Sequence, residues 1–400
     1  MFDRRSFLSA SAALAASPWA RAVRLADPET DGTLVVLQLS GGNDGLSTVI
    51  PFTDPAYQRA RGTLRFGPQE VLRLDGRRGL HPALQGLRRI WDAGHLAIVE
   101  GCGYPEPVRS HFKALEVWHT ASPRGRAAGD GWLGGTNRAL QGEAPRPEFL
   151  VHVGGNAPYS IHSATHPASS VQSPTAYRWF GETGGAQGLA QCEHEMGDED
   201  QRHRGRDRAL AQLRQVLADA EESSLRIRAA AARHPERVEY PRTAIGAQLH
   251  DAAAILCGGV GTRIVSTVMG GFDTHANQRN THDRLMRDLD AALAAFYEDL
   301  SASEAGRKVT LVVFSEFGRR VQQNGSAGTD HGKAGPMLVL GHGVRGGFHG
   351  RTPDLSSLDE GDVPFTTDFR SVYATLLEKS LGAPSEAVLG QAWPRLGFLG

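Results

Sequence analysis

The chain has 400 residues with nearly balanced charge: 43 Lys and Arg against 44 Asp and Glu give a formal net charge of -1. Hydrophobic residues make up 40% and charged residues 22%, ordinary values for a folded protein, so a wholly disordered chain is excluded. No basic excess indicates a nucleic-acid partner, and we expect none. The three cysteines, Cys102, Cys192 and Cys257, are too few for a disulfide framework.

The N-terminus has the features of an export signal. The arginine pair Arg4 and Arg5 precedes a mildly apolar run, which ends in the A-x-A cleavage pattern of residues 20–22. These features in this order are typical of a twin-arginine signal peptide, the alternative being a frayed amphipathic end. We therefore expect the twin-arginine translocase to export the chain and residues 1–22 to be removed, leaving a periplasmic or secreted protein. No later apolar stretch has the length of a membrane span.

Short apolar runs alternate with amphipathic stretches along the rest of the chain. The runs predict buried strands over 33–40, 96–101, 148–153, 262–269, 308–315 and 336–341. Helical stretches lie near 82–94, 110–120, 206–230, 242–257, 281–302 and 367–381. Strands that alternate with helices favour a three-layer α/β/α fold with a mostly parallel central sheet. We expect residues 23–400 to form one such domain, with an irregular insertion around 154–205.

Carboxylates and histidines stand beside the ends of several predicted strands. They are Asp44, Asp273, His275, Glu316, Asp330 and His331. Ligands of open α/β sheets bind beyond the carboxyl ends of the strands, so we expect these side chains to share one edge. Each motif alone also fits a structural role, such as a tight turn around Asp44. Together they predict a site for one or two divalent ions, because mixed oxygen and nitrogen ligands suit Zn or Mn, and more oxygens suit Mg or Ca.

A serine at a predicted helix start is the candidate nucleophile. Ser110 directly precedes a helix that begins at His111, and the free N–H groups of a helix N-terminus favour an anion. A metal that lowers the pKa of Ser110 would let it attack a phosphoryl or sulfuryl centre, while Arg109 holds the anionic group. His111 is a further polar partner in the site. The alternative is that Ser110 only caps the helix, a common role of serine.

Several motifs, in this order, resemble a bacterial family of exported proteins, the domain-of-unknown-function 1501 family. They are LSGGNDGLS (39–47), RSHFKALEVWHTA (109–121), GWLGG (131–135), GGFDTH (270–275), FSEFGRR (314–320), GTDHGKAGPMLVLG (328–341) and TTDFRSVYATLLE (366–378). The resemblance covers nearly the whole chain beyond the signal. The family in turn is similar to the alkaline phosphatase superfamily, which includes sulfatases. That similarity implies an alkaline-phosphatase-like α/β fold, usually with two divalent metals.

The resemblance also implies roles for single residues. Asp44 matches the metal-bridging aspartate of the superfamily. Ser110 matches the nucleophile, and His331 matches the last histidine ligand. Asp273 and His275 match an aspartate–histidine pair, although their spacing is narrower than usual. Glu316 stands where an Asp-His pair is usual, so one imidazole is missing and the number of ions, one or two, stays open.

Two functions are compatible with these features. The first is an exported metal-dependent hydrolase of phosphate or sulfate esters, acting on an anionic small molecule or a glycan ester. The second is a non-catalytic exported binding or assembly protein on the same fold, with a structural metal. Members of the family are often encoded beside another exported family, which implies an exported protein partner. A redox enzyme is the weakest alternative, since the chain has no C-x-x-C motif.

Overall fold

The computed structural model describes residues 32–122, 129–143, 145–174 and 221–400. The predicted signal at residues 1–22 lies outside the described residues, as do Cys192 and much of the predicted insertion. Cys102 and Cys257 are both free thiols. Among the described helices, none combines the length and the apolar character needed to cross a membrane.

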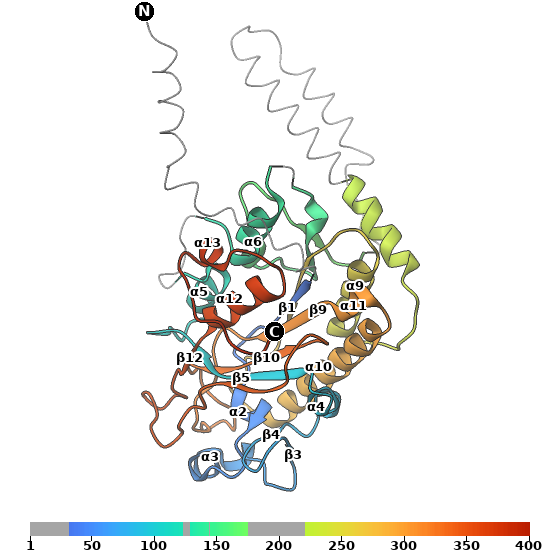
Figure 1. Ribbon diagram of the computed structural model, residues 1–400. Coiled ribbons are helices and arrows are strands. Elements are labelled where there is room, and N and C mark those ends of the chain that lie inside the picture. The colour runs from blue at the N-terminus through green and yellow to red at the C-terminus, as the bar shows by residue number, and fades with distance from the viewer. Residues whose placement is uncertain (1–31, 123–128, 144, 175–220) are drawn as a thin grey trace, which may run out of the picture.

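A nine-stranded mixed sheet lies at the centre of the molecule (Figure 1). Its strands in spatial order are β11 (Gly347–Gly350), β5 (Leu96–Gly103), β10 (Gly335–Leu340), β9 (Val309–Phe314), β1 (Thr33–Leu39), β8 (Ile264–Met269), β6 (Leu150–Val153) and β7 (Ser169–Val171), and β12 (Thr367–Asp368) also pairs with β5. Only the two pairings made by β10 are antiparallel among these strands. The predicted strands and the mostly parallel sheet are therefore confirmed.

The direction of β10 decides what gathers at one edge of the sheet. Because β10 runs against β5 and β9, the residues just before it lie at the same edge as the carboxyl ends of β1, β8 and β9. Residues 341–346 (GHGVRG), just after β10, have the G-x-G-x-x-G spacing of a dinucleotide loop. A dinucleotide-binding loop opens a helix, but residues 341–346 lead into β11 instead. The spacing therefore does not indicate a dinucleotide site.

Helices cover both faces of the sheet (Figure 1), and alternate residues of β1 belong to the two cores on either side. One layer holds α4 (Gln85–Asp92), α9 (Ala244–Cys257) and α10 (Gln278–Ser301), which pack with Val35 and Leu37. The other layer holds α5 (His111–Thr120), α6 (Trp132–Gln141) and α12 (Phe369–Lys379), which pack with Leu34 and Val36. In this second core the Trp118 ring stacks on Phe369 with centroids 4.1 Å apart. The predicted three-layer fold is thus confirmed.

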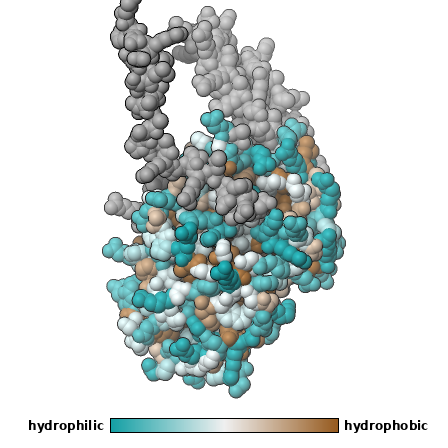
Figure 2. Space-filling view, in the orientation of Figure 1, coloured by the Kyte–Doolittle hydropathy of each residue, from teal (hydrophilic) through white to brown (hydrophobic). Residues whose placement is uncertain are grey.

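Smaller elements complete the described chain. They are α2 (Gly45–Thr48), α3 (Pro55–Ala60), α11 (Glu304–Arg307), α13 (Ser385–Leu389), the 3-10 turns Gly62–Leu64, Pro147–Phe149 and Tyr159–Ile161, a helical segment over 221–233, and a small sheet of β2 (Val49–Ile50), β4 (Gly79–Leu80) and β3 (Leu72–Arg73). The predicted insertion needs a correction, because β7 lies within it and extends the main sheet. Mainly hydrophilic residues cover the described part of the face in Figure 2, with scattered apolar patches.

Helix α6 was not predicted, and its glycines explain why. Gly134 and Gly135 weaken the helical pattern, since glycine is a poor helix former. The structure shows the reason for Gly134: a Cβ there would lie 1.9 Å from the carbonyl oxygen of His162. The helix therefore packs against the Tyr159–Ile161 turn at a distance that only glycine allows.

Candidate metal centre

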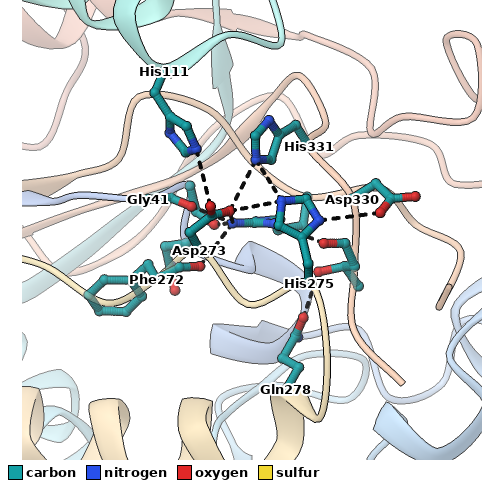
Figure 3. Close-up of polar contacts among 12 residues, drawn as sticks. Gly41, His111, Phe272, Asp273, His275, Gln278, Asp330 and His331 are labelled. Carbon is teal, nitrogen blue, oxygen red and sulfur yellow. Dashed lines mark hydrogen bonds and ion pairs between the residues drawn. The ribbon is translucent and has the colours of Figure 1, made fainter. Parts of the chain in front are cut away.

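Loops at this edge of the sheet bring three histidines and one aspartate together (Figure 3). His111 is the first residue of α5, Asp273 and His275 follow β8, and His331 precedes β10. Asp273 and His275 were expected to share the edge with His331, and the structure places all three there. His111, which the sequence suggested as a polar partner in the site without assigning its role, joins them as a fourth member. We call these four residues the metal cluster.

Asp273 lies at the centre of the metal cluster. Its Oδ1 atom is 3.0 Å from Nε2 of His275 and 3.1 Å from Nε2 of His331, and its Oδ2 atom is 3.6 Å from Nε2 of His111. The Nε2 atoms of His275 and His331 are only 2.9 Å apart. One ligand atom each from His111, Asp273 and His331 lie within 4.8 Å of one another. These separations are short enough for one ion to contact several of the side chains.

Each histidine has an oxygen acceptor on its other ring nitrogen. Nδ1 of His111 lies 2.9 Å from Oε1 of Glu316 and that of His331 lies 3.0 Å from the Arg109 carbonyl. Nδ1 of His275 lies 3.4 Å from Oδ1 of Asp330. An oxygen acceptor requires a proton on Nδ1, so each neutral ring presents a bare Nε2 lone pair to the cluster.

Converging lone pairs are the test of whether a cation fits. Nε2 of His275 and of His331 face each other, and both face a carboxylate oxygen, with no proton between them in these tautomers. Such an arrangement is repulsive without a positive charge at its centre. Histidines held by carboxylates or carbonyls through their second nitrogen are the usual form of protein metal ligands. The residues present therefore fit a divalent cation.

Arg319 positions the central aspartate. Burial alone would raise the pKa of Asp273, but the Arg319 guanidinium outweighs it and lowers that pKa to about 2. Nη2 of Arg319 donates to Oδ1 of Asp273 at 2.7 Å and to the carbonyls of Gly41 and Phe272. The fully buried guanidinium thus ties the loop after β1 to the loop after β8. Arg319 was not predicted as a site residue, although it stands only three residues after Glu316.

Glu316 and Asp330 lie behind the histidines rather than among the four cluster residues. The buried Glu316 carboxylate accepts from the Gly41 N–H at 2.8 Å and from Nδ1 of His111. Asp330 accepts from Nδ2 of Asn324 at 3.1 Å, and this hydrogen bond lowers the pKa of Asp330. Glu316 was predicted as a metal ligand, and Asp330 either as a ligand or as a partner that orients His331. In the structure the two carboxylates contact the Nδ1 atoms of His111 and His275.

Asp44 is held apart from the metal cluster. It is buried in an ion pair with Arg61, whose Nη2 donates to Oδ1 at 2.9 Å, and Oδ2 also accepts from Ser47 and Gln278. Burial alone would raise the pKa of Asp44, but the Arg61 guanidinium outweighs it and holds that pKa well below its usual range. The prediction grouped Asp44 with the ligands. The structure instead gives its oxygens to a buried arginine and two polar side chains.

Ser110 lies between two residues that contact the cluster. The carbonyl of Arg109 accepts from His331, and His111 belongs to the cluster itself. Ser110 occupies the N-cap position of α5, but its side chain makes no capping hydrogen bond. The Arg109 guanidinium is engaged elsewhere, because it donates to Oδ2 of Asp362 at 2.9 Å. The predicted anion-holding arginine is therefore occupied by a carboxylate of the same chain.

A comparison with family models agrees with the motifs. The model of a family described as "Protein of unknown function (DUF1501)" matches residues 97–389. A search of curated proteins found no match. Among solved structures, a protein in the alkaline phosphatase superfamily from Vibrio parahaemolyticus shares 10% identity at a TM-score of 0.38, over 90% of this chain and 69% of that one. The PsFucS1 sulfatase from Pseudoalteromonas sp. shares 10% identity at a TM-score of 0.37, over 90% and 68%.

Proposed function

This chain belongs to the DUF1501 family of proteins of unknown function, and from its site we propose an exported, metal-dependent hydrolase of phosphate or sulfate esters. One observation carries the proposal: the Nε2 atoms of three histidines gather around the Asp273 carboxylate, 3.0, 3.1 and 3.6 Å from its oxygens. His111, His275 and His331, together with Asp273, would hold the ion. Their donors suit Zn best and Mn next, since Mg and Ca prefer sites made of oxygen.

A bound divalent ion would supply positive charge that lowers the pKa of a nearby hydroxyl and neutralises an ester oxygen. Ser110 provides the nucleophile, because it directly precedes His111 of the cluster and its side chain makes no capping bond. Its Oγ forms a bond to phosphorus or sulfur, and the bond from that atom to the alcohol oxygen breaks. The proton lost by Ser110 is balanced by the proton that the leaving alcohol takes up. Water then releases phosphate or sulfate from the serine.

The N-terminal end of α5 contributes to binding of the ester group. This ten-residue helix begins at His111, so its free N–H groups and its positive end lie at the nucleophile. A tetrahedral anion at this end gains hydrogen bonds and favourable charge. The substrate class proposed is therefore an anionic small molecule or a glycan that carries a phosphate or sulfate ester.

Export completes the proposal. The twin-arginine pattern of residues 1–22 supports delivery to the periplasm or beyond, with residues 23–400 folding as one domain. The twin-arginine translocase would be the partner during export.

Replacing Ser110 by alanine tests the nucleophile. In metal-loaded protein, Ser110→Ala should abolish turnover of nitrophenyl phosphate and nitrophenyl sulfate while metal content stays the same. Ser303→Ala is the matched control, because Ser303 caps α11 through a bond from the Gly306 N–H. That control should lose roughly 1 kcal/mol of stability and keep its turnover. Full activity in Ser110→Ala would show that another group attacks the ester.

The second candidate is a non-catalytic binding or assembly protein with a structural metal and an exported protein partner. The ion pair of Arg109 with Asp362 favours it, because this arginine is not free to bind a substrate anion. On this account, metal-loaded protein turns over neither ester, and His331→Ala lowers the melting temperature without removing any reaction.

A further inference from the structure

An acidic turn lies beside the metal cluster. Residues 359–362 (Asp-Glu-Gly-Asp) form a two-residue hairpin in which the Asp359 N–H donates to the Asp362 carbonyl at 3.1 Å and the reverse bond is 3.0 Å. Its two central residues, Glu360 and Gly361, have φ values of 54° and 88°. Glycine adopts such angles freely, but glutamate does so at a cost. We call residues 359–362 the acidic turn.

Three cations surround the acidic turn. Arg109 pairs with Asp362, and Arg320 approaches the same carboxylate with Nε 3.4 Å from Oδ1. Nζ of Lys333 lies 2.8 Å from Asp359 and 3.2 Å from Glu360. We call Arg109, Arg320 and Lys333 the basic cradle. Its three positive charges converge on the carboxylate oxygens of the acidic turn.

The loops that build the metal cluster also build the basic cradle. Arg109 directly precedes Ser110, and its carbonyl accepts from Nδ1 of His331 at 3.0 Å. Arg320 follows Arg319, which holds Asp273, and Lys333 is two residues beyond His331. An anion in the cradle would therefore lie alongside the nucleophile and the cluster.

The acidic turn is an imperfect occupant of the cradle. Asp362 is completely buried, yet its Oδ1 atom has no hydrogen-bond partner in the described chain, and burial raises the pKa of this carboxyl. The other two carboxylates are largely exposed, 49% for Asp359 and 72% for Glu360, so water screens their ion pairs. The screened pairs, the buried oxygen that accepts no hydrogen bond and the unfavourable φ of Glu360 all weaken this contact.

We propose that the basic cradle is an anion subsite, filled in this structure by the acidic turn and used by a second phosphate or sulfate group of the substrate. The inference rests on the proposed function for the ester that is cleaved, and it narrows the substrate to molecules with at least two anionic groups. Binding of such a substrate would displace the acidic turn. Arg109 would then be free to hold an anion, as the sequence suggested.

Anion binding without metal tests the subsite separately from catalysis. The variant Asp359→Asn/Glu360→Gln weakens the acidic turn at two exposed positions. With chelator present, calorimetric titration with inorganic phosphate should give a Kd at least about tenfold lower than that of the unchanged protein, equivalent to about 1.4 kcal/mol. Adding Arg320→Ala should remove this gain. The control Glu304→Gln/Asp354→Asn loses the same charge away from the cradle and should bind like the unchanged protein.

A second measurement uses the unchanged chain. Saturating phosphate should speed hydrogen exchange at the N–H groups of Asp359 and Asp362, because the turn that protects them is displaced. Equal phosphate affinity in the turn variant and the unchanged chain would overturn the proposal, as would a gain that survives Arg320→Ala. Failure of the hydrolase proposal would appear instead as absent turnover in metal-loaded protein, with phosphate binding as described.

Discussion

Two aspartates at the same edge of the sheet should have different roles. Asp44→Asn should mainly lower stability, whereas Asp273→Asn should mainly remove metal binding. Asp44→Asn removes the negative partner of Arg61, and both side chains are completely buried. Breaking a buried ion pair from one side leaves an uncompensated charge and costs about 3–5 kcal/mol. Arg61 keeps a bond to the Arg320 carbonyl at 3.2 Å, so we expect the lower part of that range.

Asp273→Asn should lower the stability of metal-free protein less than Asp44→Asn does. The Asp273 side chain is 48% exposed, and Arg319 keeps its bonds to backbone carbonyls when the carboxylate is lost. The same substitution should abolish tight metal binding, because it removes the charge on which the histidines converge. Asp44→Asn should leave metal affinity within about threefold, well under the tenfold that 1.4 kcal/mol represents.

Urea unfolding of the metal-free proteins measures the change in stability. Competition with a fluorescent zinc chelator measures the change in metal affinity. The stability difference for Asp44→Asn also depends on pH. Because the pKa of Asp44 is lowered in the folded state, its contribution is present above the unfolded value of about 3.9 and is lost as the pH falls below it. If Asp44→Asn left stability unchanged, or removed metal binding from a folded protein, the assignment of Asp44 to the ion pair would be refuted.

Three further effects are expected. Glu316→Gln should weaken zinc binding about 10–100-fold, because it removes the charge that orients His111, and competition titration measures this. Zinc at 100 times its Kd should raise the unfolding free energy by about 2.7 kcal/mol in the unchanged chain, and a thermal scan should show no such gain in Asp273→Asn. Burial lowers the pKa values of His119, His152 and His282 to about 4, so metal-free protein should lose stability as the pH falls from about 6.5 towards 4. In urea titrations, His119→Gln should reduce that slope by up to about 1.4 kcal/mol per pH unit.

The sheet and its functional edge were predictable because their signals are local. Continuous apolar runs bounded by turn residues predicted the strands, and the residues beside the strand ends predicted Asp273, His275 and His331. The antiparallel direction of β10 was not predictable in this way, since it depends on the path between two strands. Its effect on the site was small, because residues before an antiparallel strand reach the edge where its neighbours end.

The role of each carboxylate could not be predicted without the tertiary structure. Whether an aspartate or glutamate binds a cation, supports a histidine or pairs with an arginine depends on partners distant in sequence. Asp44 meets Arg61 from 17 residues away, and Glu316 meets His111 across 205 residues. The role of Arg319 depends on carbonyls from separate loops, and no motif encodes such a set.

Metal content tests the central claim most directly. Protein purified without chelator, and reconstituted with zinc if necessary, would be measured by mass spectrometry beside the Asp273→Ala/His331→Ala variant. The account predicts a stoichiometric divalent metal in the unchanged chain and its loss from the variant. A folded, unchanged chain that holds no metal after reconstitution, or a variant that holds as much as the unchanged chain, would contradict it.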